Sequence, residues 1–193
     1  MCGRYLIEDE AYADIWELLN DPIMAQNIAR GEIFPAATAA VYTNDGIAAV
    51  KWGFPHWQNT GVIINARSET ALEKNMFRKA LRERRCVVPS NGFYEWRRVS
   101  GRKYKDKYLF RQPKDRMLYM AGMVSTFKDT LGVEYSAFVI LTTAANESVA
   151  PIHDRMPVIL EPDERNWWLE DDVFMELALH RPSPELVSEI VRI

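Results

Sequence analysis

The sequence has few of the residues that build disulfide frameworks and metal centres. Its 193 residues include two cysteines, Cys2 and Cys86, and three histidines, with no HExxH-like spacing. Two cysteines this far apart exclude a disulfide framework and a cysteine-based zinc site. We therefore expect neither a metal ion nor another cofactor, and the low cysteine content suits a reducing cytoplasm.

Long apolar runs are also absent. No run approaches the roughly 20 residues of a membrane span, and the N-terminal residues lack the basic-then-apolar pattern of a secretory signal. Hydrophobic residues make up 48% of the chain and charged residues 26%, which is typical of a globular protein and excludes a disordered one. We expect a cytoplasmic protein without a membrane partner, folded as a single domain over residues 1–193.

The charge is unevenly distributed along the chain. The formal net charge is −3, yet eleven Lys and Arg stand against three Asp and Glu between Arg78 and Lys107, a local charge of about +8. This asymmetry is typical of a protein with one face that binds a polyanion. A solvated basic helix followed by a basic hairpin would give the same count, so charge alone leaves both interpretations open.

Helical and strand-like patterns alternate irregularly. Apolar residues recurring every three or four positions predict helices over 9–20, 68–85 and 163–169. Apolar or alternating runs predict strands over 47–53, 61–65, 86–96, 107–111, 117–126, 134–143, 157–160 and 186–193. The mixed order favours an α+β fold, with a strongly curved, mostly antiparallel sheet (a pseudo-barrel) flanked by a few helices.

Cys2 becomes an unusual nucleophile once Met1 is removed. The freed α-amine has a pKa of about 7.7–8, so part of it is unprotonated at neutral pH. The amine can form an imine with an aldehyde, and the thiolate can then close a five-membered thiazolidine ring. While Met1 remains, this nitrogen is an amide and the ring cannot form. Taken alone, however, a cysteine at position 2 can also be accidental.

Three further segments carry functional groups beside turns or strand ends. Asn65 and Arg67 lie between an apolar strand and a helix, where an amide and a guanidinium can project into a cleft. Glu95 lies among aromatic residues, where burial would raise its pKa and suit it to proton transfer. His153 is flanked by charges and prolines, and histidine ordinarily changes charge near neutral pH. Glu95 could equally pair with Arg97, and a lone histidine is more often structural.

Aromatic residues are dense between positions 52 and 57. Trp52, Phe54 and Trp57 could stack on nucleic-acid bases, although aromatic residues at this density more often form core. His56 and His180 have no setting comparable to that of His153.

The motifs MCGRY, INARSET, NGFYEW, LTTAA and IHDRMP occur in this order between residue 2 and about residue 160. This ordered set resembles the signature of the SRAP family (SOS-response-associated peptidases), whose members shield abasic sites in single-stranded DNA. The resemblance implies that the partner is single-stranded DNA carrying an abasic site. It also implies a covalent DNA–protein crosslink, with abasic-site lyase activity as a further possibility.

The resemblance implies a role for each motif residue. Cys2 would supply the thiol and the amine that bond to the ring-opened sugar, and Asn65 would position the Cys2 end of the chain. Glu95 would assist proton transfer in imine formation and reversal, while His153 would assist opening of the sugar ring. The residues implied in DNA binding are Arg4, Pro35, Trp52, Arg67 and Thr142.

Two positions depart from the family pattern. An Asn-x-Ala-Pro segment is usual near position 35, whereas this chain reads Glu32-Ile33-Phe34-Pro35, so the wall of the DNA channel is expected to differ. Asn75 stands where a basic residue usually precedes Met-Phe.

Two other functions remain open on the residues alone. Cys2 and His153 could form a cysteine hydrolase that cleaves peptides, including the bond after Met1. The basic stretch and the aromatic residues could instead serve a non-catalytic single-strand binding module.

Overall fold

The computed structural model describes residues 2–19, 26–56, 61–115 and 117–191. The fold is α+β with mostly antiparallel strands, which confirms the predicted class. The helices are α1 (Asp9–Leu19), α3 (Asn75–Glu83), α4 (Arg165–Glu170) and α5 (Asp172–His180). The strands of the barrel region are β3 (Thr38–Thr43), β4 (Gly46–Trp52), β7 (Asn65–Arg67), β8 (Arg85–Ser90), β11 (Leu118–Lys128), β12 (Glu134–Ala144), β13 (Arg155–Pro157) and β14 (Ile159–Leu160). A second sheet holds β1 (Arg4–Ile7), β2 (Gly31–Ile33), β9 (Gly92–Arg97), β10 (Asp106–Arg111) and β15 (Val187–Ile190), and β5 (Phe54–Pro55) pairs with β6 (Val62–Ile63).

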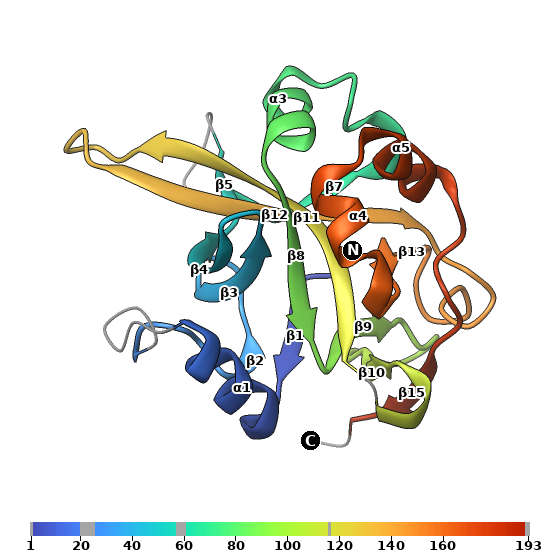
Figure 1. The fold of residues 1–193 in the computed structure, drawn as a ribbon. Coiled ribbons are helices and arrows are strands. Elements are labelled where there is room, and N and C mark those ends of the chain that lie inside the picture. Colours follow the sequence, from blue (N-terminus) through green and yellow to red (C-terminus); the bar gives the residue numbers. More distant parts are fainter. Residues whose placement is uncertain (1, 20–25, 57–60, 116, 192–193) are drawn as a thin grey trace.

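The larger sheet closes on itself. The pairings run β12–β4–β3–β8–β11 and back to β12, so these strands form a barrel. The β12–β4 and β12–β7 pairings are parallel, and the other pairings are antiparallel. Figure 1 shows β11 and β12 continuing past the barrel as a long hairpin.

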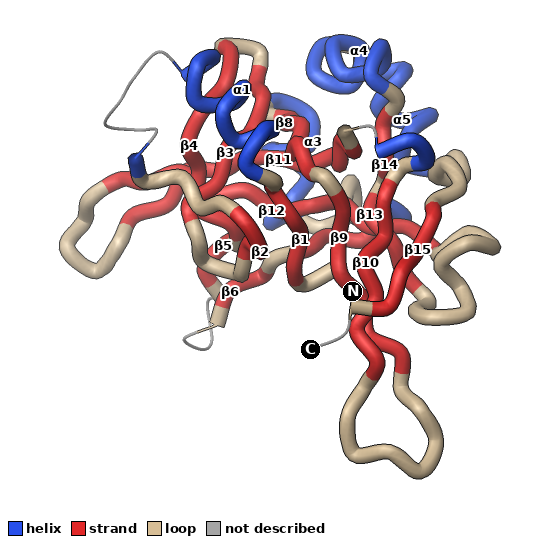
Figure 2. The backbone as a smooth tube through the Cα atoms, turned by 90° about the horizontal axis from the view of Figure 1, so that it is seen from below, coloured by secondary structure: helices blue, strands red, loops and turns tan. Residues whose placement is uncertain are grey.

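The second sheet has the order β15-β10-β9-β1-β2 and is antiparallel throughout. It brings the N-terminal strand beside the NGFYEW segment, with Arg4 opposite Tyr94. Gly92 opens β9 because a Cβ there would lie 2.5 Å from the carbonyl oxygen of Phe110. β9 and β10 can therefore lie close together at Gly92. Figure 2 shows the loop that connects these two strands standing out from the body of the protein.

Alternate side chains of the barrel strands enter two apolar clusters. In β8, Cys86 and Val88 join the cluster that also holds the buried face of α1, whereas Val87 joins the cluster beneath α3, α4 and α5. Trp168 of α4 anchors that second cluster, and its indole N–H donates to the Cys86 carbonyl oxygen at 2.9 Å. Helices α3, α4 and α5 therefore cover one side of the barrel, and α1 lies apart from them (Figure 1).

The structure corrects several predicted boundaries. The helix expected over 68–85 is a 3-10 turn at Ser68–Thr70 followed by α3, because Ala71 between them is fully buried and keeps the chain close to the core. The strand expected over 86–96 is divided at Asn91, whose N–H donates to the Leu6 carbonyl and whose side chain accepts from the N–H of Glu8. These bonds carry the chain from the barrel into the second sheet.

No helix in the described part of the chain is long and apolar enough to cross a membrane.

Candidate functional site

Cys2 lies between the two sheets, just before β1 and beside β7. Cys2, Asn65, Glu95 and His153 are together called the Cys2 site below. Its side chain is fully buried, and its S–H donates to the Arg4 carbonyl oxygen at 3.6 Å. Asn65 Nδ2 donates to the Cys2 carbonyl oxygen at 2.8 Å, which is the contact expected of a residue that positions Cys2. Burial raises the pKa of the Cys2 thiol, and the nearby Glu95 carboxylate raises it further.

Glu95 lies on the inner face of β9. Its side chain is 3% exposed, and burial raises its pKa above the ordinary value for glutamate. With Arg4 opposite Tyr94, the register of β1 and β9 brings Glu95 close to the Cys2 end of β1. Arg97, the alternative partner considered for Glu95, instead bonds Asp106 at 3.4 Å.

His153 lies beside Glu95, on the more exposed side of the Cys2 site. Its Nε2 is 3.7 Å from Glu95 Oε2, and its side chain is 24% exposed. The N–H of Arg155 donates to His153 Nδ1 at 3.0 Å, and Asp154 Oδ1 lies 3.0 Å from the same nitrogen. The structure thus brings together Cys2, Asn65, Glu95 and His153.

Tyr5 is a neighbour of this site that the sequence patterns did not single out. Its hydroxyl is buried and has no hydrogen-bond partner among the described residues, as is the case for Asn65 Oδ1. Burial raises the pKa of Tyr5, and Cys2 and Cys86 raise it further. The alternation of β1 turns Tyr5 inward, into the apolar cluster that also holds Cys2 and Cys86, which the sequence shows only once residues 4–7 are known to form a strand.

Arg67 lies on the rim of a neighbouring hollow. It is exposed and lines a space of about 370 Å³ together with Asn65, Lys74 and Phe77. The hollow connects the residue that holds Cys2 with two cationic side chains, which suits a phosphate backbone. Lys74 was not predicted, and its position immediately before Asn75 is the only signal the sequence offers.

Arg4 and Pro35 lie on the outer face of the second sheet. Arg4 Nη1 donates to Glu32 Oε1 at 2.9 Å, and its guanidinium lies 4.4 Å from the centre of the exposed Phe34 ring. Pro35 is half-buried next to Phe34, and the chain turns after it through Ala36, which has a φ of 69°. Glu32 thus contacts one of the arginines implied in DNA binding.

Trp52 is fully buried, which contradicts the expectation that its ring stacks on a base. The ring packs between Tyr5 and Phe138, and its Nε1–H donates to the Ile64 carbonyl oxygen at 3.1 Å. Trp52 therefore fixes the backbone just before Asn65. Phe54 is also fully buried, and Trp57 lies outside the described residues.

Thr142 is also fully buried, so its side chain does not offer a surface for DNA. Its Oγ1 lies 3.5 Å from the Ala66 carbonyl oxygen, and its own carbonyl accepts from Arg155 Nη2 at 2.6 Å. Arg155 also forms a bidentate pair with Glu69 at 2.5 and 2.9 Å. Thr142 thus supports the strand that carries Asn65 and the segment that follows His153.

The basic stretch from Arg78 to Lys107 does not form one continuous face. Its first part lies on α3 and its last part on the β9–β10 hairpin, at opposite ends of the molecule in Figure 1. Between them, Arg85 is buried and bonds Asp172 at 2.8 Å. The split arises because β8 runs along the barrel from α3 to the second sheet.

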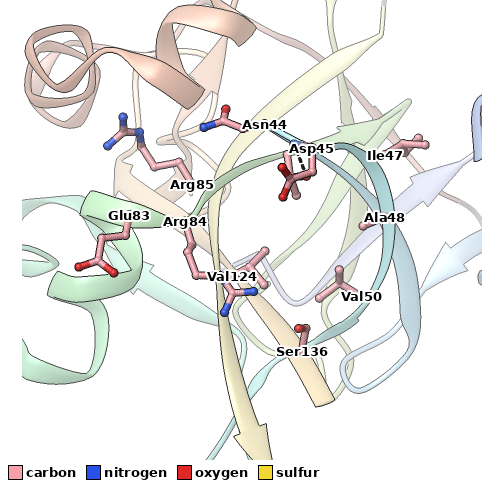
Figure 3. Close-up of a pocket in the computed structure, with 11 residues that line it drawn as sticks. Asn44, Asp45, Ile47, Ala48, Val50, Glu83, Arg84, Arg85, Val124 and Ser136 are labelled. Atoms are coloured by element: carbon pink, nitrogen blue, oxygen red, sulfur yellow. Dashed lines mark hydrogen bonds between the residues drawn. The ribbon is translucent and has the colours of Figure 1, made fainter. Parts of the chain in front are cut away.

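A separate hollow of about 240 Å³ lies between the β3–β4 turn and the end of α3 (Figure 3). None of the predicted site residues line it. Within the described ranges, no group of three or more His, Cys, Asp and Glu side chains could hold a metal ion.

The model of the family described as SOS response associated peptidase (SRAP) matches residues 1–191. The chain belongs to the SRAP family. A relative from Bacillus subtilis, Abasic site processing protein YoqW, is 34% identical over 184 residues, covering 88% of this chain and 80% of YoqW. Abasic site processing protein YedK from Escherichia coli is 28% identical, covering 90% and 81% of the two chains.

Solved structures share the SRAP fold of this chain. A crystal structure of a protein from Bacteroides thetaiotaomicron has a TM-score of 0.83 at 23% identity and covers 99% of this chain and 92% of its own. A protein from Bordetella bronchiseptica has a TM-score of 0.76 at 21% identity, with complete coverage of both chains.

Proposed function

We propose that this SRAP protein processes abasic sites in single-stranded DNA by forming a covalent crosslink through Cys2. The observation that carries the proposal is that Cys2, Asn65, Glu95 and His153, from distant parts of the chain, lie together in the Cys2 site. The names of the YoqW and YedK relatives support the same substrate class.

The chemistry requires that Met1 first be hydrolysed from the chain, either by the protein itself or by an aminopeptidase. The freed α-amine of Cys2 then adds to the aldehyde of the ring-opened sugar, and loss of water leaves an imine. The Cys2 sulfur adds to the imine carbon, its proton passes to the nitrogen, and a thiazolidine closes. Elimination of the 3′ phosphate from the imine would instead give abasic-site lyase activity.

The burial of Cys2 and the charge of Glu95 favour attack by the amine before attack by the sulfur. Burial and Glu95 both raise the pKa of the Cys2 thiol, so little thiolate exists at neutral pH and the amine reacts first. A Cys–His hydrolase needs the opposite, a thiolate stabilised by an imidazolium. His153 Nε2 here faces Glu95, which supports a role in proton transfer and weakens the peptidase alternative.

Abasic single-stranded DNA distinguishes these functions. Processed wild-type protein should give an adduct that survives denaturing electrophoresis, and Cys2→Ala should give none, although its amine still forms a transient imine. Cys86→Ala is the matched control, because Cys86 is equally buried but lies within β8. A stable adduct from Cys2→Ala would overturn the proposal. Peptide turnover without any adduct would favour the hydrolase, and reversible binding alone would favour a binding module.

A further inference from the structure

One carboxylate joins two cations on the outer face of the second sheet. Glu32 Oε1 accepts from Arg4 Nη1 at 2.9 Å, and Glu32 Oε2 accepts from Lys107 Nζ at 2.6 Å. Glu32, Arg4 and Lys107 come from β2, β1 and β10 of this sheet, in which β9 separates β1 from β10. Their side chains are 25%, 38% and 12% exposed, respectively. Glu32, Arg4 and Lys107 therefore lie at the surface, and Arg4 is two residues from Cys2 along the chain.

Aromatic rings hold the two cations in place independently of Glu32. Arg4 lies 4.4 Å from the ring centre of Phe34 and 5.2 Å from that of Trp96. Lys107 Nζ lies 3.9 Å from the ring centre of Tyr94. Such cation–π contacts favour these positions of the charges. The cations can thus stay where they are when the carboxylate moves away.

A DNA phosphate and the Glu32 carboxylate need the same donors. Both anions accept charge-assisted hydrogen bonds from a guanidinium and an ammonium, so they compete for the same N–H groups. Burial raises the pKa of Glu32, but the hydrogen bonds from Lys107 and Arg4 outweigh it and lower the pKa below its ordinary value. The carboxylate is therefore charged at neutral pH.

We propose that Glu32 is a built-in competitor of the DNA backbone: it occupies Arg4 and Lys107 in the free protein, and a phosphate of the single strand displaces it. The inference rests on the proposed function, and it adds Lys107 as a phosphate contact. Its consequence is a lowered affinity for undamaged single strands, so that retention on DNA depends on the covalent bond at Cys2.

The test compares Glu32→Gln with Glu8→Gln in binding to an undamaged, fluorescent single-stranded oligonucleotide over a range of salt concentrations. Glu8 is the matched control, because its carboxylate binds Arg111 of the same sheet at 2.7 Å and its loss changes the net charge equally. Glu32→Gln should bind about 10-fold more tightly at low salt. Its salt slope should steepen by up to about 0.7, because no freed carboxylate takes up a cation. Glu8→Gln should stay within about twofold of wild type.

Lys107→Gln gives a second measurement in the wild-type background. It should weaken binding several-fold and flatten the salt slope, whereas a Lys107 that only supports Glu32 would leave both unchanged. If wild type binds and Glu32→Gln binds no more tightly than wild type, or binds more weakly, then Glu32 orients Arg4 and the inference is wrong. Absence of binding by wild type and by Glu32→Gln alike would also overturn the inference, whereas only the absence of a crosslink to abasic single strands would overturn the proposed function. Melting temperatures of all variants establish that they are folded.

Discussion

At the scale of single residues, Glu95 is the group whose surroundings most alter its chemistry. A carboxylate that is almost fully buried loses the hydration that favours its charged form, so its pKa is raised. The folded protein then binds the Glu95 proton more tightly than the unfolded chain does. The contribution to stability is complete below the unfolded pKa and is lost as the pH rises through the folded one. Glu95 therefore costs stability at neutral pH, as residues kept for function often do.

Glu95→Gln should separate these two effects. Because loss of one positioned acid or base costs about 10²–10⁴ in rate, crosslinking and its reversal should slow by that factor, with DNA affinity nearly unchanged. Chemical denaturation should show the variant more stable than wild type above the raised pKa, with the difference shrinking as the pH falls below the ordinary pKa of glutamate. Single-turnover adduct formation at several pH values measures the first effect, and equal rates for both proteins would contradict the assignment.

His153→Ala should affect ring opening more than imine formation. A proton must reach the ring oxygen of the closed hemiacetal. His153, which is more exposed than Glu95 in the Cys2 site, is placed to deliver it. Crosslinking should slow by about 10²-fold or more on a closed abasic site, and by less on an analogue that already presents a free aldehyde. Equal slowing on both substrates would remove this role from His153.

The sequence could single out the four residues of the Cys2 site but not all their neighbours. Cys2, Asn65, Glu95 and His153 stand in motifs, and each motif has chemistry that can be named from its residues. The neighbours of Tyr5 and Glu32 lie on other strands, and they follow only from the strand register. For the same reason, Trp52 could not be assigned to the core or the surface before its neighbours were known.

At the scale of elements, the short strand β7 determines where Cys2 lies. Its parallel pairing with β12 sets Asn65 opposite Ile140, and Trp52 holds the preceding carbonyl. The expected strand over 61–65 did not reveal this, because its residues divide between β6 and β7 with different partners. Longer runs such as β11 and β12 were predicted well, since many apolar residues favour one pairing. The strands β1, β2 and β3 were missed, because they are short or lack a clear alternation.

Asn65→Ala should therefore slow crosslinking without weakening DNA binding. It removes the hydrogen bond to the Cys2 carbonyl, and a reacting group displaced by about 1 Å can lose about 10²-fold in rate. Asn75→Ala is the control, because Asn75 is exposed at the start of α3 and contacts Arg78. The comparison needs the rate of adduct formation and the affinity for an unreactive oligonucleotide. If both variants reacted at the wild-type rate, Asn65 would have no part in positioning Cys2.

At the scale of the whole molecule, the barrel decides which cations can act together. The linear count between Arg78 and Lys107 allowed either one basic face or a basic helix followed by a basic hairpin, and β8 carries the chain along the barrel and separates the two parts. The arginines near the Cys2 site, Arg4 and Arg67, come from β1 and β7 and not from this basic stretch. A net charge of −3 is therefore compatible with a local polyanion site.

Salt dependence should distinguish these cations from the rest. Each phosphate neutralised on a single strand releases counterions and contributes about −0.7 to the slope of log affinity against log salt. Arg4→Gln and Arg67→Gln should each reduce the steepness of this slope by about 0.7. Arg84→Gln, with the same change in charge, should leave it unchanged, because Arg84 bonds Thr126 and lines the separate hollow of Figure 3. If all three substitutions reduced the steepness of the salt slope equally, binding would respond to total charge. The DNA strand would then not lie at the Cys2 site.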